Sequence, residues 1–111
     1  MITKVIDMGS DFSRSPFGRY PNDGRNSGER FRKEILVPLM KDSDVVCIEV
    51  RLDSVEQGYE YGSSFLHEAF GVLVRDEGFS PEEVKSKIKI VTKHDDYKRE
   101  IYQYVADPGG R

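Results

Sequence analysis

The chain has 111 residues, which is enough for one hydrophobic core and one domain that folds without metal or disulfide staples. Hydrophobic residues make up 37% of it and charged residues 33%, a balance that excludes a disordered chain. The formal net charge of −3 gives no global attraction to a nucleic-acid backbone, and no apolar run approaches the ~20 residues of a membrane span. We therefore expect one soluble domain with no membrane partner.

The single cysteine and the N-terminal segment bear on the cellular compartment. Cys47 lies inside an apolar run and has no second cysteine with which to form an internal disulfide, which predicts a buried thiol in a reducing compartment. The segment from Met1 to Asp7 lacks the long apolar stretch of a signal peptide. Together these features predict a cytoplasmic location.

The first element is a short strand over Ile2 to Met8, predicted by its β-favouring residues and by the Gly9-Ser10-Asp11 sequence that follows. The next twenty residues, 9–28, contain four glycines and two prolines, so no regular element is expected there. We predict a long Gly- and Arg-rich loop at 9–28. A loop of this length in a small domain is more often functional or mobile than passive.

The first helix is predicted from about Ser27 to Lys41. Asn26 and Glu29 have the spacing of a capping box, and the apolar residues that follow recur every four positions on one helical face. Pro38 is expected to bend the last turn of this helix.

The middle of the chain predicts a central strand followed by a second helix. The segment from Val45 to Leu52 is nearly all apolar and β-branched in its first half, which is typical of a strand buried on both faces. After a turn-prone stretch through Gly58, apolar residues at helical spacing predict a helix that begins near Gly62-Ser63-Ser64 and continues to Val74.

The last third of the chain predicts a helix, a strand and a helix. Ser80-Pro81-Glu82-Glu83 is a strong helix start, because a serine cap, a proline and two acids suit the first turn. A strand over Ile88 to Thr92 and a terminal helix that ends near Ala106 follow. This alternation predicts an α/β fold: one domain over residues 1–111, with helices packed against a mixed or parallel sheet.

The boundary from Gly58 to Phe65 is the first candidate functional segment. It follows the central strand and opens a helix, where free backbone N–H groups and the helix dipole favour an anion. A phosphate on Ser63 or Ser64 would be stabilised at this position. The alternative is that one of these two serines merely caps the helix.

The second candidate is a cluster of arginines in and just after the long loop. Guanidinium groups bind phosphate and carboxylate in a bidentate manner, so the cluster could hold a nucleotide, a phosphorylated segment or an acidic partner. The alternative is a set of solvated side chains. The cluster consists of Arg14, Arg19, Arg25, Arg30 and Arg32.

The sequence gives little indication of catalysis. His67 and His94 are far apart, Cys47 has no cysteine companion, and no glycine-rich stretch matches a P-loop. We therefore predict no metal site, no cofactor and no enzymatic activity. A weaker alternative is an enzyme whose site is assembled from Arg19, Arg25, Ser63 and His67.

The stretch from about Arg19 to Val74 resembles the STAS-like domain of unknown function found in bacteria and their mobile elements. The matching motifs are the Gly-Arg loop, Ser27-Gly28-Glu29-Arg30-Phe31-Arg32, the strand Val45 to Leu52, and Gly62-Ser63-Ser64-Phe65-Leu66-His67-Glu68-Ala69-Phe70-Gly71. STAS domains proper include anti-sigma-factor antagonists, which bind a histidine-kinase-type ATPase and are released when it phosphorylates a serine at this strand-to-helix junction. The resemblance places that serine at Ser63 or Ser64, although Gly62 stands where antagonists usually carry an acid.

These observations predict a non-catalytic regulatory module that binds a protein partner, with a histidine-kinase-type ATPase as the implied partner and serine phosphorylation as the switch. The alternative is a nucleotide- or nucleic-acid-binding module that uses the arginines. The residues predicted to bind a partner or an anion are Arg19, Arg25, Arg30, Arg32, Tyr61, Phe65, His67 and Glu68.

Overall fold

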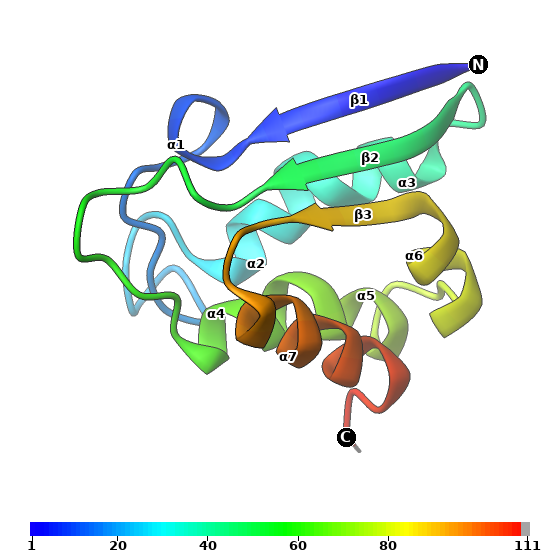
Figure 1. Ribbon diagram of the computed structural model, residues 1–111. Helices are drawn as coiled ribbons and strands as arrows, with labels where there is room; N and C mark the ends of the chain where they lie inside the picture. The colour runs from blue at the N-terminus through cyan, green and yellow to red at the C-terminus, as the bar shows by residue number, and fades with distance from the viewer. Residues whose placement is uncertain (110–111) are drawn as a thin grey trace.

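Three strands form a sheet in the order β1–β2–β3 (Figure 1). The computed structural model describes residues 1–109, and in it β1 spans Ile2–Asp7, β2 spans Val45–Arg51 and β3 spans Ile88–Val91. Both strand pairs are parallel. The predicted α/β class is therefore confirmed, and the sheet is parallel rather than mixed.

Two long helices, each interrupted by a π-helical turn, follow β1 and β2, and shorter helices complete the fold. The bounds are α1 Met8–Asp11, α2 Gly28–Phe31, η1 Arg32–Leu36, α3 Val37–Lys41, α4 Ser63–Leu66, η2 His67–Gly71, α5 Val72–Arg75, α6 Pro81–Lys87 and α7 Asp95–Ala106. The segments α2–η1–α3 and α4–η2–α5 each run as one continuous helix.

The predicted loop at 9–28 is wrong at its start, where one helical turn, α1, forms. The side chain of Met8 is fully buried, and the Met8 carbonyl accepts hydrogen bonds from the N–H groups of Phe12 and Ser13. Burial of Met8 thus stabilises a turn that the glycine content disfavours. The remaining segment, residues 12–27, has no helix or strand and is called the arginine loop below.

The first long helix is capped by Ser27 rather than by Asn26, so the predicted capping box is wrong by one residue. The Ser27 Oγ accepts a hydrogen bond from the Arg30 N–H at 3.2 Å. Pro38 follows the π-helical turn η1, in which the Val37 N–H bonds to the Arg32 carbonyl. Proline has no N–H to donate, and the π-helical irregularity lies directly before it. The predicted bend of the last turn stays a prediction.

The helices gather on one side of the sheet (Figure 1). The chain crosses the sheet in one direction, from β1 to β2 to β3. Because crossovers between parallel strands are right-handed, both connecting helices then lie on the same face. In β2, Ile48 and Val50 are buried whereas Arg51 is exposed. The prediction that β2 is buried on both faces is therefore wrong, and Cys47, expected to be buried, is partly exposed on the open face.

The core between the sheet and the helices is built around aromatic side chains. Phe31, Phe65 and Phe70 are buried. The ring centroid of Phe31 lies 6.0 Å from that of Phe65 and 6.1 Å from that of Phe70. The two long helices approach closely at Gly28, where an added Cβ would lie 2.7 Å from the Phe65 carbonyl oxygen. This contact sets the start of α4 beside the arginine loop.

The C-terminal third agrees with the prediction. Ser80 caps α6, and its hydroxyl and the Glu83 carboxylate form the full capping box. β3 and α7 follow close to the expected positions. None of the helices within residues 1–109 combines the length and the apolar character needed to cross a membrane.

Candidate functional site

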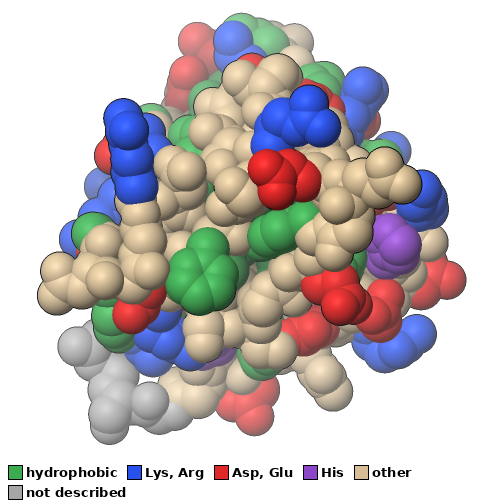
Figure 2. Space-filling view, turned by 90° about the vertical axis from the view of Figure 1, so that its left-hand side faces the viewer, with side chains coloured by type: hydrophobic (Ala, Val, Ile, Leu, Met, Phe, Trp, Pro, Cys, Tyr) green, Lys and Arg blue, Asp and Glu red, His purple; other side chains and the backbone are tan. Residues whose placement is uncertain are grey.

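The candidate site lies at the carboxyl ends of the strands, where the arginine loop meets the start of α4. This end of the molecule faces the viewer in Figure 2, and acidic and basic side chains are interspersed across it. In open α/β sheets, ligands bind outside the carboxyl ends of the strands, at the point where the strand order reverses. The order β1–β2–β3 has no reversal, so this rule indicates the end of the sheet alone. The position therefore matches the one at which a binding surface is expected.

The start of α4 has two exposed serines and no side-chain cap. Gly62 is the N-cap residue, and Ser63 and Ser64 occupy the first two helical positions. Within the described part of the chain, their backbone N–H groups make no hydrogen bond. The alternative that Ser63 or Ser64 serves as the N-cap is therefore not what the structure shows, and this helix end retains free donors.

A hollow of about 410 Å³ separates the start of α4 from the arginine loop. Phe17 is 64% exposed, and together with Arg19 it brings apolar and cationic groups to the loop side of this hollow. The hollow is lined by Phe17, Gly18, Arg19, Asp23, Gly62, Ser63, Ser64 and Phe65. Sequence reasoning missed Phe17 and Asp23, because only the fold shows that the loop turns back onto α4.

Backbone hydrogen bonds tie the arginine loop to its surroundings. The carbonyls of Gly18 and Arg19 accept from the N–H groups of Gly28 and Glu29 at 2.9 and 3.0 Å. The Arg14 carbonyl accepts from the Glu56 N–H at 2.8 Å. The loop is therefore an ordered wall of the hollow in this conformation.

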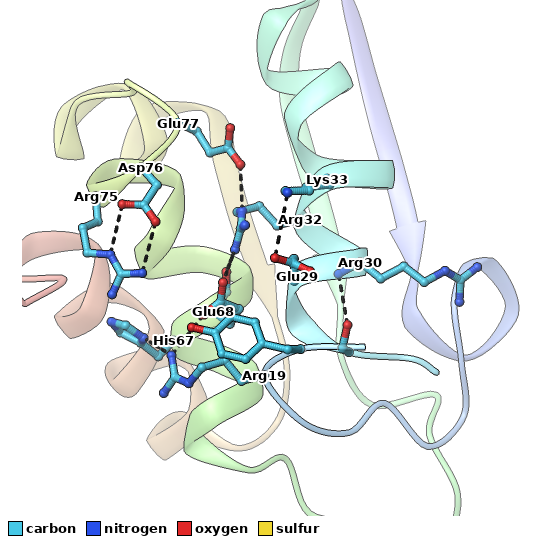
Figure 3. Close-up of polar contacts among 12 residues, drawn as sticks. Arg19, Glu29, Arg30, Arg32, Lys33, His67, Glu68, Arg75, Asp76 and Glu77 are labelled. Carbon is cyan, nitrogen blue, oxygen red and sulfur yellow. Dashed lines mark hydrogen bonds and ion pairs between the residues drawn. The ribbon is translucent and has the colours of Figure 1, made fainter. Parts of the chain in front are cut away.

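An ion-pair network centred on the buried Arg32 and Glu68 side chains is connected to the hollow through Arg19, which lines it (Figure 3). Arg32 is 3% exposed and Glu68 is 2% exposed, and the Arg32 Nη1 lies 2.7 Å from both the carboxylate and the carbonyl oxygen of Glu68. Glu77 accepts from the Arg32 Nε at 2.9 Å, and Arg19 donates to the other Glu68 oxygen at 3.1 Å. The network joins both long helices and the arginine loop.

The eight residues predicted to bind a partner or an anion differ in burial. Four of them, Arg32, Tyr61, Phe65 and Glu68, are buried, with no more than 7% of any residue exposed, so they position a binding surface rather than form most of it. His67 is half-buried behind Arg19. The sequence pattern could not reveal the burial of Arg32 and Glu68, because these two charged partners are 36 residues apart in the sequence.

The other arginines of the predicted cluster do not form one free basic patch. Arg30 bonds to the Glu34 carboxylate at 3.2 Å and to the Asn26 side chain at 2.8 Å. Arg14 and Arg25 are exposed, and among the described residues neither makes an ion pair. Of the five arginines of the predicted cluster, Arg14 and Arg25 are therefore the two that have no ion-pair partner within residues 1–109.

A second, smaller hollow of about 210 Å³ follows the ends of β2 and β3 and was not predicted. Tyr59, Tyr61 and Tyr97 line it, with ring centroids 5.0 and 5.2 Å apart for successive pairs. Burial is the main reason that the pKa values of Tyr59 and Tyr61 are raised, so both phenols stay protonated. The Tyr59 hydroxyl donates to the Pro16 carbonyl and the Tyr61 hydroxyl to the Leu52 carbonyl, and these bonds fix the loop between β2 and α4.

Metal ligation and comparison with known proteins complete the description of the site. Within residues 1–109, no three His, Cys, Asp or Glu side chains are grouped so that they could hold a metal ion. A family model described as a STAS-like domain of unknown function (DUF4325) matches residues 27–98, a span that includes the start of α4. Searches of the curated proteins and of the solved structures found no significant match.

Proposed function

This chain belongs to the family of STAS-like domains of unknown function, and on that premise we propose that it is a non-catalytic regulatory module that binds a protein partner. The docking face is the start of α4 with the adjoining arginine loop. The partner is a histidine-kinase-type ATPase, and phosphorylation of Ser63 or Ser64 is the switch that changes the affinity. The protein acts in the cytoplasm.

The observation that carries this proposal is the uncapped, exposed start of α4. A kinase needs an accessible hydroxyl, and Ser63 and Ser64 are both exposed at the rim of the hollow. In the transfer, the serine oxygen bonds to the γ-phosphorus of ATP, ADP leaves, and the hydroxyl proton is released. The phosphate adds about −1.5 to −2 charge at a helix end whose free N–H groups and dipole stabilise an anion.

The hollow explains how such a phosphate would alter docking. Phe17 gives it an exposed apolar part, since 64% of this residue is accessible, whereas Phe65 lines the hollow but is buried. Exposed aromatic side chains such as Phe17 are typical anchors of protein interfaces. A dianion at its rim would have to be desolvated when a partner covers the apolar surface, which costs free energy. Phosphorylation is therefore expected to weaken binding.

The local geometry argues against the alternative site assembled from Arg19, Arg25, Ser63 and His67. The two ring nitrogens of His67 lie 2.7 Å from the Arg19 Nη1 and 2.7 Å from the Pro108 carbonyl oxygen. A general base must have a free nitrogen within reach of the nucleophile. His67 therefore has no nitrogen available to activate Ser63, which supports a non-catalytic role.

The experiment is an affinity capture from the native cytosol with the wild-type chain and with Ser63→Asp, Ser64→Asp and Ser86→Asp variants. Ser86 is an exposed serine on α6, remote in sequence from the hollow, and serves as the matched control. We expect wild type and Ser86→Asp to retain an ATPase partner and at least one of the other two to lose it. Mass spectrometry should find phosphate on Ser63 or Ser64.

Loss of binding in Arg14→Ala and Arg25→Ala, with all serine variants unaffected, would contradict the proposal. If the captured species is then a nucleotide or nucleic acid, and binding weakens steeply with salt, the arginine-dependent alternative is correct.

A further inference from the structure

The His67 ring contacts the arginine loop on one side and the segment after α7 on the other, and these two contacts together define the protonation state of the ring. Its Nδ1 lies 2.7 Å from the Arg19 Nη1, and its Nε2 lies 2.7 Å from the Pro108 carbonyl oxygen. A guanidinium can only donate, so Nδ1 must be the acceptor. A carbonyl oxygen can only accept, so Nε2 must carry the proton. Only the neutral Nε2–H ring satisfies both partners.

Protonation of His67 is incompatible with this arrangement. It would place an N–H on Nδ1 directly against an N–H of Arg19, so that two donors and two positive charges face each other at hydrogen-bond distance. Among the described residues, the Arg19 side chain would then retain its bond to Glu68, at 3.1 Å. We propose that His67 is a proton-sensitive latch, whose neutral ring anchors Arg19 and whose protonated ring releases it.

The charges around the ring support release rather than accommodation of the proton. Arg19 and Arg32 already balance Glu68 and Glu77, and Arg75 at the end of α5 is paired with Asp76 at 3.1 Å. A protonated ring therefore leaves one positive charge in excess. From α7, the Tyr104 ring packs edge-on at 5.1 Å, and burial, chiefly, raises the pKa of its phenol, which therefore stays neutral. Two carboxylates lie close in sequence to Tyr104 and Pro108, and both already accept a hydrogen bond. Glu100 accepts from the Tyr104 hydroxyl at 2.7 Å, and Asp107 accepts from the Gly109 N–H at 3.4 Å.

Release of Arg19 would loosen the wall of the larger hollow. The Arg19 carbonyl accepts from the Glu29 N–H, and the neighbouring Gly18 carbonyl accepts from the Gly28 N–H, so the anchored side chain also holds the cap of α2 in place. When the latch opens, these two amides lose protection, and the Arg19 side chain, which already lines the hollow, is no longer held in one position there. Acid would thereby change the docking face without any phosphate.

The test is an NMR titration of the full chain between about pH 8 and pH 5, the range in which histidine changes charge. At the upper limit, the ring nitrogen shifts of His67 should report an Nε2–H tautomer. On acidification, the exchange protection of the Gly28 and Glu29 amides, corrected for intrinsic rates, should fall by about tenfold, as expected for loss of a charged hydrogen bond.

Two variants assign this response, because the chain has only two histidines. In His67→Asn, the amide oxygen can replace the Nδ1 acceptor but gains no proton, so protection should stay high at both pH limits. In His94→Asn, which alters an exposed residue just before α7, the wild-type response should persist.

Three results would overturn the proposal: an Nδ1–H tautomer at about pH 8, an unchanged pH response in His67→Asn, or loss of the response in His94→Asn. The tautomer measurement uses the wild-type chain and is decisive even where His67→Asn fails to fold.

Discussion

At the start of α2, three consecutive backbone N–H groups are satisfied, whereas at the start of α4 the equivalent groups have no acceptor among residues 1–109. Gly28 and Glu29 donate to loop carbonyls, and Arg30 donates to the Ser27 hydroxyl. At α4, the N-cap is Gly62, and the serines lie one and two positions inside the helix. One helix start therefore uses its serine for stability, and the other leaves its serines available for chemistry.

The difference follows from burial. Ser27 is fully buried, and an unpaired donor or acceptor there would lower the free energy of unfolding. A stable fold therefore requires the cap. The start of α4 is exposed, and water satisfies its N–H groups at little cost. An uncapped helix end at the surface is thus tolerated, and it leaves a surface that an anion or a partner can bind.

The largest expected effect comes from the ion pair that joins the two helices. In Arg32→Met, the buried Glu68 carboxylate loses its closest cation, and we expect the free energy of unfolding to fall by about 3–5 kcal/mol. Urea denaturation measures this loss. In the control Arg30→Met, which removes the solvent-exposed pair with Glu34 and the hydrogen bond to Asn26, the loss should be about 1–2 kcal/mol. Equal losses in the two variants would show that Arg32 contributes no more than a surface arginine.

The second comparison uses one glycine from each helix start. In Gly28→Ala, the new Cβ would lie 2.7 Å from the Phe65 carbonyl oxygen and 2.9 Å from the Glu68 Cβ, so the helices must separate. We expect a loss of about 1–3 kcal/mol in the free energy of unfolding. In Gly62→Ala nothing lies within 4 Å of the new Cβ, and the change should stay within about 0.5 kcal/mol. Similar thermal stability of both variants would contradict the close approach of the helices.

The third comparison uses one serine from each helix start. Ser27→Ala removes a buried cap and should lower the free energy of unfolding by about 1 kcal/mol. Ser63→Ala removes a hydroxyl that caps nothing and whose interaction is with the Tyr104 side chain near the surface, so its effect should be below about 0.5 kcal/mol. Chemical denaturation of both variants under one set of conditions measures the difference. A larger loss for Ser63→Ala would mean that its hydroxyl is structural rather than available for modification.

The order of helices and strands could be predicted because it depends on local patterns. The capping residues at Ser80, the apolar stripe after Ser64 and the β-branched run from Val45 all act within one element. The one-residue error at Ser27 has a tertiary cause. Asn26 and Ser27 are both good caps, and the choice depends on Gly28, the residue that fits against Phe65.

The interior of the site could not be predicted, because its residues meet only in the folded chain. Arg32 and Glu68 look like surface charges beside apolar stripes until the two helices pack together. The open face of β2 was missed for a related reason. Its apolar run resembles a strand buried on both faces, and only the strand order shows that both crossovers cover the same face.

The smallest expected effect is a gain, and it tests the comparison most directly. Gly62 has φ −79° and ψ 148°, which any residue adopts, so Gly62→Ser can supply the cap that α4 lacks. We expect the free energy of unfolding to rise by about 0.4–1 kcal/mol, from the lower entropy of the unfolded chain and the new hydrogen bond. In the control Gly78→Ser, φ of +86° disfavours a side chain, so the stability should fall. A loss in Gly62→Ser would mean that the free N–H groups of α4 are not available to an acceptor, and the anion-binding role proposed for this helix start would lose its physical basis.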